Sequence, residues 1–165
     1  MNNVVFTPRW WILLVSLVIP WIVWYLLVYK KRLIEILIYI ALLSGIFLLF
    51  DEVGNTLTLW IYPIKTVSLF PRLLPMCCSL SPLTYALIYQ YFPKWKGFIF
   101  ADIIASAVLS FIILPLATGW DYLIILNWKY IYSTFVFIIS ALISKLFIEI
   151  VNTIENRSTA QASDS

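Results

Sequence analysis

Five apolar runs dominate this chain and limit how it can fold. They occupy approximately residues 10–29, 33–50, 73–92, 97–116 and 130–146. A helix needs about 20 mostly apolar residues to cross the roughly 30 Å of hydrocarbon in a bilayer, and only 12% of the residues are charged, against about a quarter in soluble domains. The sequence therefore predicts an all-α fold, a polytopic transmembrane helical bundle of five spans, with residues 1–151 forming one bundle.

The longest interruption between these runs is the segment 51–75. Its apolar part, residues 56–64, is too short to cross a bilayer. Its apolar residues alternate with polar ones, which favours an extended strand. They are also spaced as in a helix, although Pro63 would interrupt that helix. Both alternatives place the segment at the membrane interface, between spans two and three.

Charged and aromatic side chains gather along this interfacial segment. Two acids stand at its start, and two bases, Lys65 and Arg72, stand in its second half. These charges either recognise a charged headgroup or peptide, or pair with each other. Exposed ion pairs contribute only about 0–1 kcal/mol, so stability is not their main role. The candidate external recognition site comprises Asp51, Glu52, Trp60, Tyr62 and Arg72.

The positions of the basic residues predict the orientation of the chain. Two tight turns, 30–32 and 94–96, together with Lys145 and Arg157, place seven of the 11 basic residues on one side of the membrane. Basic residues in short loops favour the cytoplasmic side. We therefore expect the N-terminus outside and the C-terminus inside, with residues 152–165 as a disordered cytoplasmic tail. The first run has no small-residue cleavage site, so we expect it to be a span and not a signal peptide.

Asp102 is the main candidate for intramembrane chemistry. It lies inside the predicted fourth span and starts a four-residue spacing continued by Ser106 and Ser110. A carboxylate inside a span costs about 2.5–3.5 kcal/mol on insertion scales, which favours a functional role such as proton transfer. The alternative is that Asp102 reaches the interface or pairs with a lysine of the turn 94–96. With Glu35 and Gln90, which the topology places on the same side, it forms a candidate intramembrane polar site.

Several kinds of chemistry are disfavoured by what the sequence lacks. The chain has no histidine, the commonest general base and metal ligand. Its two cysteines, Cys77 and Cys78, are adjacent, which is poor geometry for a disulfide and too few ligands for structural zinc. We interpret them as helix packing residues, with a redox-sensitive or heavy-metal-binding pair as the alternative. Catalytic and phosphate-binding motifs are missing too. We expect no enzyme activity, cofactor or metal, and the net charge of +3 is too small to predict nucleic-acid binding.

Short aromatic and proline patterns recur along the chain. They are Lys31-Arg32-Leu33 with Glu35-Ile36-Leu37, Leu59-Trp60 with Tyr62-Pro63, Pro71-Arg72 with Pro75, Tyr89-Gln90-Tyr91-Phe92-Pro93 with Trp95-Lys96, and Asn127-Trp128-Lys129 with Tyr132-Ser133. In these patterns the chain resembles an uncharacterised family of small multi-pass membrane proteins of spore-forming Firmicutes. The resemblance implies a location in the bacterial cytoplasmic membrane and brings no activity, substrate or catalytic residue with it.

Two functional hypotheses follow. The first is a non-enzymatic accessory or regulatory subunit that acts through a membrane-protein partner or a second copy of itself, with helix contacts at small-residue pairs. These pairs are Ala41/Gly45, Ala101/Ala105 and Ser140/Ser144. The second hypothesis is a small carrier or proton-linked permease that uses Asp102. A lipid-modifying enzyme is a third, weaker alternative.

Overall fold

The computed structural model describes residues 8–63 and 76–163, and these are mainly helical. The α-helices are α1 (Pro8–Leu27), α2 (Leu33–Thr56), α3 (Ser81–Tyr91), α4 (Trp95–Val108), α5 (Leu114–Gly119) and α6 (Tyr130–Ser163). The 3-10 helix η1 (Lys30–Arg32) precedes α2, and the π-helical segments η2 (Met76–Leu80) and η3 (Leu109–Ile113) adjoin α3 and α4. Two short strands, β1 (Trp60–Ile61) and β2 (Ile124–Ile125), complete the described secondary structure.

Four helical stretches in the described part of the chain are long and apolar enough to cross a membrane. They are Trp10–Leu27, Lys30–Thr56, Trp95–Gly119 and Tyr130–Glu155. Many large apolar side chains on these helices face outward, for example Leu26 at 76% and Ile34 at 75% exposure. Outward apolar surface on this scale suits lipid and not water. The helices are those of a membrane-embedded protein.

The predicted third span is only partly visible. The helix formed by η2 and α3 starts at Met76 and ends at Tyr91, which is about 24 Å at 1.5 Å per residue and shorter than the hydrocarbon core. Its predicted start near residue 73 lies outside the described residues. The expectation of five spans is therefore not confirmed, although a fifth helical segment is present.

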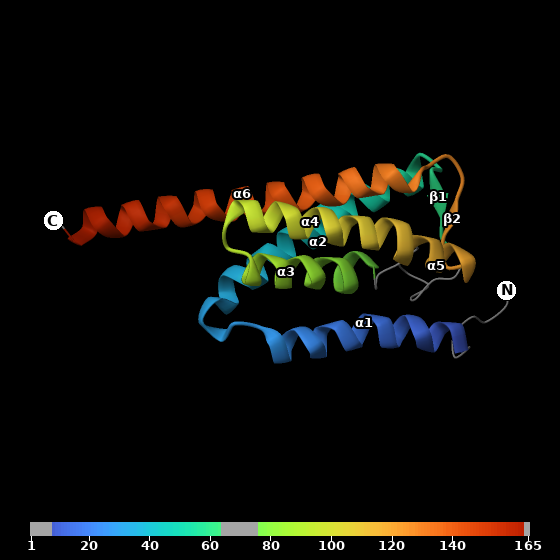
Figure 1. The fold of residues 1–165 in the computed structure, drawn as a ribbon, viewed down its shortest axis with the longest axis horizontal. Helices are drawn as coiled ribbons and strands as arrows, with labels where there is room; N and C mark the ends of the chain where they lie inside the picture. The colour runs from blue at the N-terminus through green and yellow to red at the C-terminus, as the bar shows by residue number, and fades with distance from the viewer. Residues whose placement is uncertain (1–7, 64–75, 164–165) are drawn as a thin grey trace.

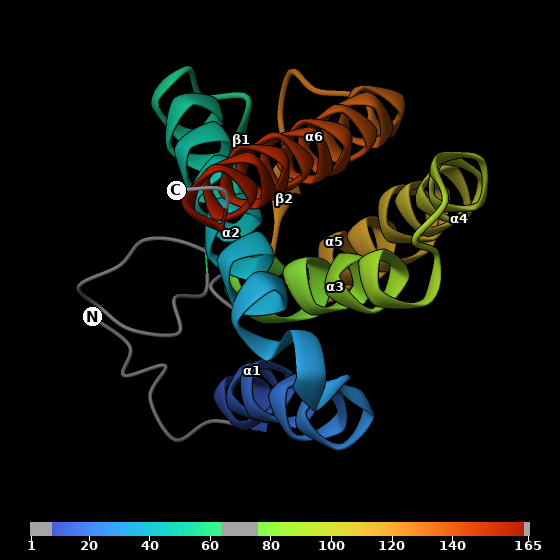
Figure 2. The same ribbon diagram turned by 90° about the vertical axis from the view of Figure 1, so that its left-hand side faces the viewer.

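The helices form a ring of four with one helix beside it. Contacts join α2 to α3, α3 to α4, α4 to α6 and α6 back to α2, while α1 packs against η2 and α3. The end-on view shows α1 at the edge of this arrangement (Figure 2). The short helix α3 is therefore central, between α1 on one side and the larger helices on the other.

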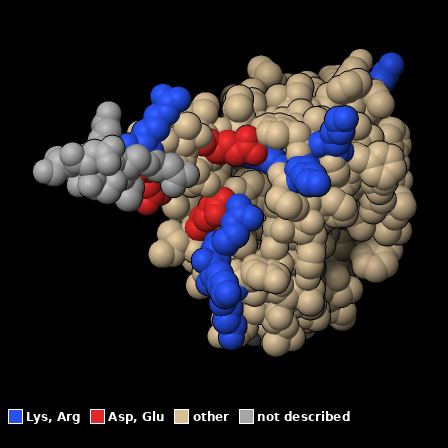
Figure 3. Space-filling view, turned by 60° about the vertical axis from the view of Figure 1, so that its left-hand side comes forward, with Lys and Arg blue, Asp and Glu red and all other residues tan. Residues whose placement is uncertain are grey.

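Successive helices run in alternate directions, which creates two distinct ends (Figure 1). The turn at η1, the turn between α3 and α4, and the projecting end of α6 share one end, which we call the basic end. The strands β1 and β2 lie at the other, the hairpin end. Figure 3 shows lysine and arginine side chains gathered beside acidic ones at the basic end.

At the hairpin end, α2 and α5 finish in the same way. Thr58 and Asp121 each adopt a left-handed conformation, with φ of 56° and 59°. After α2, Leu59 N–H bonds Gly54 O and Thr58 N–H bonds Asn55 O, the pattern of a Schellman motif. Residues 117–122 repeat this pattern after α5. Both turns feed a strand, and β1 and β2 pair antiparallel with Trp60 opposite Ile125.

Two element boundaries differ from the sequence-based expectation. The second apolar run was expected to end near residue 50, but α2 continues to Thr56, because the small and polar residues 51–56 lie where the helix leaves the apolar region. Residues 152–163, expected to be disordered, belong to α6; no break in helix-compatible residues separates them from the apolar run.

The sequence allows both an extended and a helical conformation for residues 56–64 of the interfacial segment. The structure has an extended strand in this part, at Trp60–Ile61.

Candidate functional site

Asp51 is the centre of a hydrogen-bonded group at the hairpin end. It lies in the last turns of α2 and is 5% exposed. The turn after α2 and the strand β1 fold back over it, so that Trp60 Nε1 donates to Asp51 Oδ1 at 3.1 Å. The Tyr62 hydroxyl donates to the same carboxylate oxygen. Burial, and the nearby Asp51 carboxylate, raise the pKa of Tyr62 well above its usual value, so this donor keeps its proton at physiological pH.

The close approach of Trp60 to α2 depends on Gly54. A Cβ atom built at Gly54 would lie 2.0 Å from two atoms of the indole ring. The ring occupies the space of the missing side chain and is only 7% exposed. Only glycine at this position lets the indole approach the helix this closely and reach Asp51.

A cavity of about 80 Å³ lies beside this group. It is bounded mostly by aromatic and aliphatic side chains from α2, β1, η2, α5, β2 and α6. The residues of its wall are Phe47, Phe50, Asp51, Trp60, Tyr62, Met76, Cys77, Ser81, Leu114, Leu123, Ile125, Trp128, Ser133, Val136 and Phe137. The rings of Phe50, Trp60 and Trp128 contact one another, with centroids 5.3–5.9 Å apart. Elements distant in sequence thus line a small, mainly apolar cavity beside one carboxylate.

The structure brings three of the five predicted external residues together. Asp51, Trp60 and Tyr62 share the hydrogen bonds above. Glu52, the next residue along α2, is exposed and does not line the cavity. Arg72 and Lys65 lie outside the described residues, so the predicted ion pairs between acids and bases of this segment are not tested.

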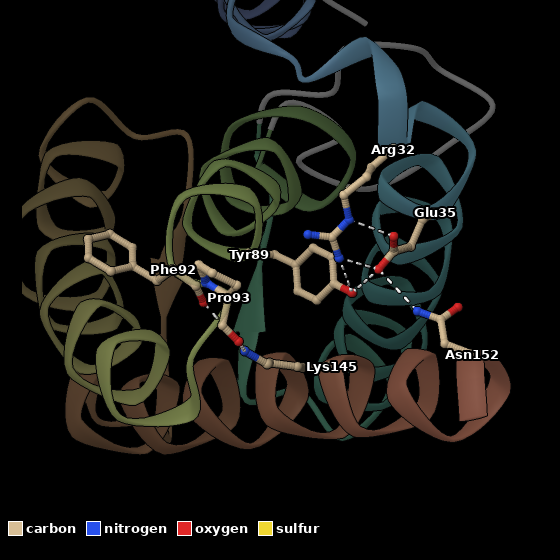
Figure 4. Close-up of polar contacts among 7 residues, drawn as sticks. All are labelled: Arg32, Glu35, Tyr89, Phe92, Pro93, Lys145 and Asn152. Atoms are coloured by element: carbon tan, nitrogen blue, oxygen red, sulfur yellow. Dashed lines mark hydrogen bonds and ion pairs between the residues drawn. The ribbon is translucent and has the colours of Figure 1, made fainter. Parts of the chain in front are cut away.

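A second polar group lies at the basic end and joins three helices (Figure 4). Arg32 donates to both oxygens of Glu35, from Nε at 2.8 Å and from Nη2 at 2.6 Å. Glu35 also accepts from the Tyr89 hydroxyl and from Asn152 Nδ2 at 3.2 Å. One carboxylate therefore ties the start of α2 to the end of α3 and to α6, which is a structural role.

Lys145 is an almost fully buried cation near this group. It is 1% exposed, and its Nζ donates to the carbonyl oxygens of Pro93 at 2.9 Å and Phe92 at 3.4 Å. The ammonium also lies 4.4 Å from the ring centroid of Phe98. A cation near the C-terminus of α3 is favoured by the helix dipole, so Lys145 fixes the turn between α3 and α4 against α6.

Asp102 is separate from the other two members of the predicted polar site. It is fully buried in the ring of helices, and Oδ1 accepts from Ser106 Oγ at 3.2 Å. Ser106 in turn bonds the Tyr85 hydroxyl at 2.7 Å. Asp102 forms no ion pair with a lysine of the turn 94–96, the alternative considered above. Its Oδ2 atom has no hydrogen-bond partner among the described residues.

The Gln90 side chain forms hydrogen bonds with main-chain groups. Its amide accepts from Tyr29 N–H at 2.7 Å and donates to Leu27 O at 2.9 Å. These are main-chain groups at the break between α1 and η1 that a continuous helix would have satisfied. Glu35, Gln90 and Asp102 therefore occupy three different settings and do not form the single cluster that the topology suggested.

Sequence reasoning missed several residues of these groups. Lys145 was used only for orientation, although a lysine inside an apolar run is itself a signal for a buried partner. Tyr85 and Ser81 were not singled out, because their contacts with α4 and the cavity depend on tertiary packing. Within residues 8–63 and 76–163, no three acidic or cysteine side chains cluster as metal ligands would.

Comparison of the chain with protein-family models, with curated proteins and with solved structures finds no match. We therefore infer function from the geometry of the sites themselves.

Proposed function

We propose that this protein is a non-enzymatic accessory or regulatory subunit of the bacterial cytoplasmic membrane, which binds a small ligand at its hairpin end and acts through a membrane partner. The observation that carries the proposal is the aromatic cavity around Asp51. A concave, mostly apolar site with a few converging polar groups is the usual form of a small-molecule site. The cavity, at about 80 Å³, is too small for chemistry on a large substrate.

The partner in this proposal would contact the outer face of α2. Ala41 is exposed, and a Cβ atom added at Gly45 would meet no atom of the chain within 4 Å. Small residues four apart let two helix backbones approach closely in lipid. Ser140 and Ser144, another of the predicted pairs, are buried inside the ring and are used within the chain.

The proposed topology has five spans, with the hairpin end outside and the C-terminus inside. The alternating helix directions and the shared position of the two basic turns support it (Figure 1). Reporter fusions after Arg32, Lys96 and Ser165 should report the cytoplasm, and one after Trp60 the exterior. An externally active fusion at Ser165 would refute this topology.

The partner is tested by crosslinking and co-purification from native membranes, followed by mass spectrometry. Wild-type protein should retain a membrane partner, or a second copy, that Gly45→Leu loses. Gly119→Leu is the matched control, because Gly119 also has no atom within 4 Å of an added Cβ. Equal partner recovery with Gly45→Leu and wild type would exclude the outer face of α2, and no partner under any condition would refute the subunit function.

The buried carboxyl group of Asp102 favours a second candidate, a proton-linked carrier. Its hydrogen bond to Ser106, and that of Ser106 to Tyr85, form a polar chain between α3 and α4. A carrier should move a solute or protons in proteoliposomes as the only protein present, and Asp102→Asn should abolish that movement. If the purified protein is inert while its partner is active only in its presence, the subunit function holds.

A further inference from the structure

The Asp51 cavity combines an aromatic wall with two polar groups that can accept hydrogen bonds. One is the Asp51 carboxylate at the end of α2. The other is the Ser81 hydroxyl at the start of α3; Ser81 is fully buried, lines the cavity, and its Oγ has no hydrogen-bond partner among the described residues. A buried hydroxyl without a partner is destabilising. A partner for Ser81 inside the cavity would remove this cost.

Asp51 contributes a carboxylate to the described wall of the cavity. Two donors, Trp60 Nε1 and the Tyr62 hydroxyl, reach the Asp51 carboxylate, and hydrogen bonds to a carboxylate favour its ionised form. A carboxylate has about four acceptor positions, so it can accept from a ligand as well as from these donors. No lysine or arginine stands among the described residues of the wall.

The aromatic wall also favours a positive ligand. The negative face of an indole or phenyl ring attracts a cation, most strongly for tryptophan and away from water. Phe50, Trp60 and Trp128 contribute mutually contacting rings on one side of the cavity. A carboxylate and aromatic faces around one small space form the setting in which an organic ammonium ion is stabilised.

The size of the cavity limits the ligand. A cavity of about 150 Å³ holds one benzene molecule, and the Asp51 cavity has about half that volume, 80 Å³. It therefore accommodates an ammonium group with a short alkyl stem and excludes a peptide or an aromatic amine.

We propose that the Asp51 cavity is a binding site for a primary ammonium group on a short alkyl chain, whose N–H groups donate to the Asp51 carboxylate and Ser81 Oγ while its carbon atoms contact the aromatic wall. The same chemistry occurs in free alkylamines and in the ethanolamine headgroup of a phospholipid. The inference names the ligand class for the binding function proposed above and depends on that function having its site here.

The test uses the full chain in nanodiscs of phosphatidylglycerol, with propylammonium as the probe and propanol as its neutral match of equal heavy-atom count. Binding is measured by saturation-transfer NMR with titration, which suits weak ligands. Wild-type protein should bind propylammonium at least tenfold more tightly than propanol. Asp51→Asn should reduce propylammonium affinity at least tenfold, and Ser81→Ala severalfold.

Glu52→Gln is the matched control, because it removes the same charge one residue away, on an exposed side chain outside the cavity. It should leave the affinity unchanged. Equal affinity of propanol and propylammonium, or an Asp51→Asn variant that binds propylammonium as wild type does, would overturn the proposal. If Asp51→Asn does not fold, the comparison of the two probes on wild type and on Ser81→Ala decides the question.

A second set of nanodiscs containing phosphatidylethanolamine separates the two sources of the ligand. If this lipid competes with propylammonium, the natural ligand is the lipid headgroup. If propylammonium binds equally well in both sets of nanodiscs, the natural ligand is a soluble amine. Failure of propylammonium to bind in the phosphatidylglycerol discs would overturn the proposal. The subunit function is judged separately by partner recovery, so a cavity that binds propylammonium in a protein without a partner would refute only the subunit function.

Discussion

Substituting Gly54 by alanine tests how the hairpin end is held together. The added Cβ would lie 2.0 Å from the Trp60 ring, whereas ordinary contact starts near 3.4 Å. The ring would have to move by the difference, 3.4 − 2.0 = 1.4 Å. A shift of this size away from α2 breaks the 3.1 Å hydrogen bond from Trp60 Nε1 to Asp51 and disturbs the edge-to-face contact between the Trp60 and Trp128 rings.

The cost follows from these changes. A hydrogen bond to a charged group contributes about 1.5–3 kcal/mol, and overpacking a close contact costs about 1–3 kcal/mol. Alanine offsets part of this, because it is favoured over glycine in a helix by about 1 kcal/mol. We expect Gly54→Ala to lower the free energy of unfolding by about 1–3 kcal/mol, given that part of the overpacking and the lost bond are the same event.

Gly45→Ala is the matched control in the same helix. An added Cβ at Gly45 meets nothing within 4 Å, so this substitution should raise the free energy of unfolding by about 0.5–1 kcal/mol. Both variants can be unfolded in mixed micelles with increasing denaturing detergent, and unfolding can be followed by tryptophan emission. The emission spectrum of folded Gly54→Ala should already be shifted relative to that of the wild-type protein. Equal stability of the two variants would refute the view that Trp60 needs the space at Gly54.

Three further substitutions test other contacts. Glu35→Gln should lower the free energy of unfolding, measured in the same assay, by about 1–2 kcal/mol, because it weakens the hydrogen bonds from Arg32, Tyr89 and Asn152. The effect is moderate because the Arg32 side chain is 43% exposed, so water screens its ion pair with Glu35. Thr58→Gly should raise the free energy of unfolding by about 0.5–1 kcal/mol, because glycine adopts the left-handed φ of 56° at this position without strain. A lower free energy of unfolding for this variant would contradict the left-handed turn. For Tyr62, burial raises the folded pKa, so stability is full below the unfolded pKa of about 10 and falls as pH rises above it. The stability difference between wild type and Tyr62→Phe should therefore shrink by up to about 1.4 kcal/mol per pH unit above pH 10, and a constant difference would contradict the raised pKa.

The elements that could be predicted from sequence are those set by local apolar length. The four long helical stretches follow directly from their apolar runs, because a bilayer requires that length. The position of Trp60 and Tyr62 beside Asp51 was anticipated only as membership of one interfacial segment. Both side chains donate to one carboxylate oxygen because of the turn at Thr58 and the space at Gly54. The residue types threonine and glycine do not by themselves predict these two roles.

The placement of Asp102 shows where topology alone is insufficient. Loop charges predict which side of the membrane a residue approaches, and Glu35 and Gln90 do share one end of the bundle, where Glu35 contacts Arg32 and Gln90 contacts Tyr29. Loop charges do not predict which face of the helix turns inward. Ser106 and Tyr85 draw Asp102 into the ring of helices, while Arg32 holds Glu35 at its rim. Such pairings connect residues of different helices and are decided by packing.

Helix α6 links the two ends of the molecule as a single rod. Trp128, just before it, and Phe137 in its second turn line the Asp51 cavity, and the helix continues past the basic end to Ser163 (Figure 1). Its 34 residues span about 51 Å at 1.5 Å per residue. A tilt of about 5° pivoting at the cavity would swing the far tip by roughly 4 Å. A change in the tilt of this helix at the cavity therefore produces a displacement that grows along the helix and is largest at the tip outside the bundle.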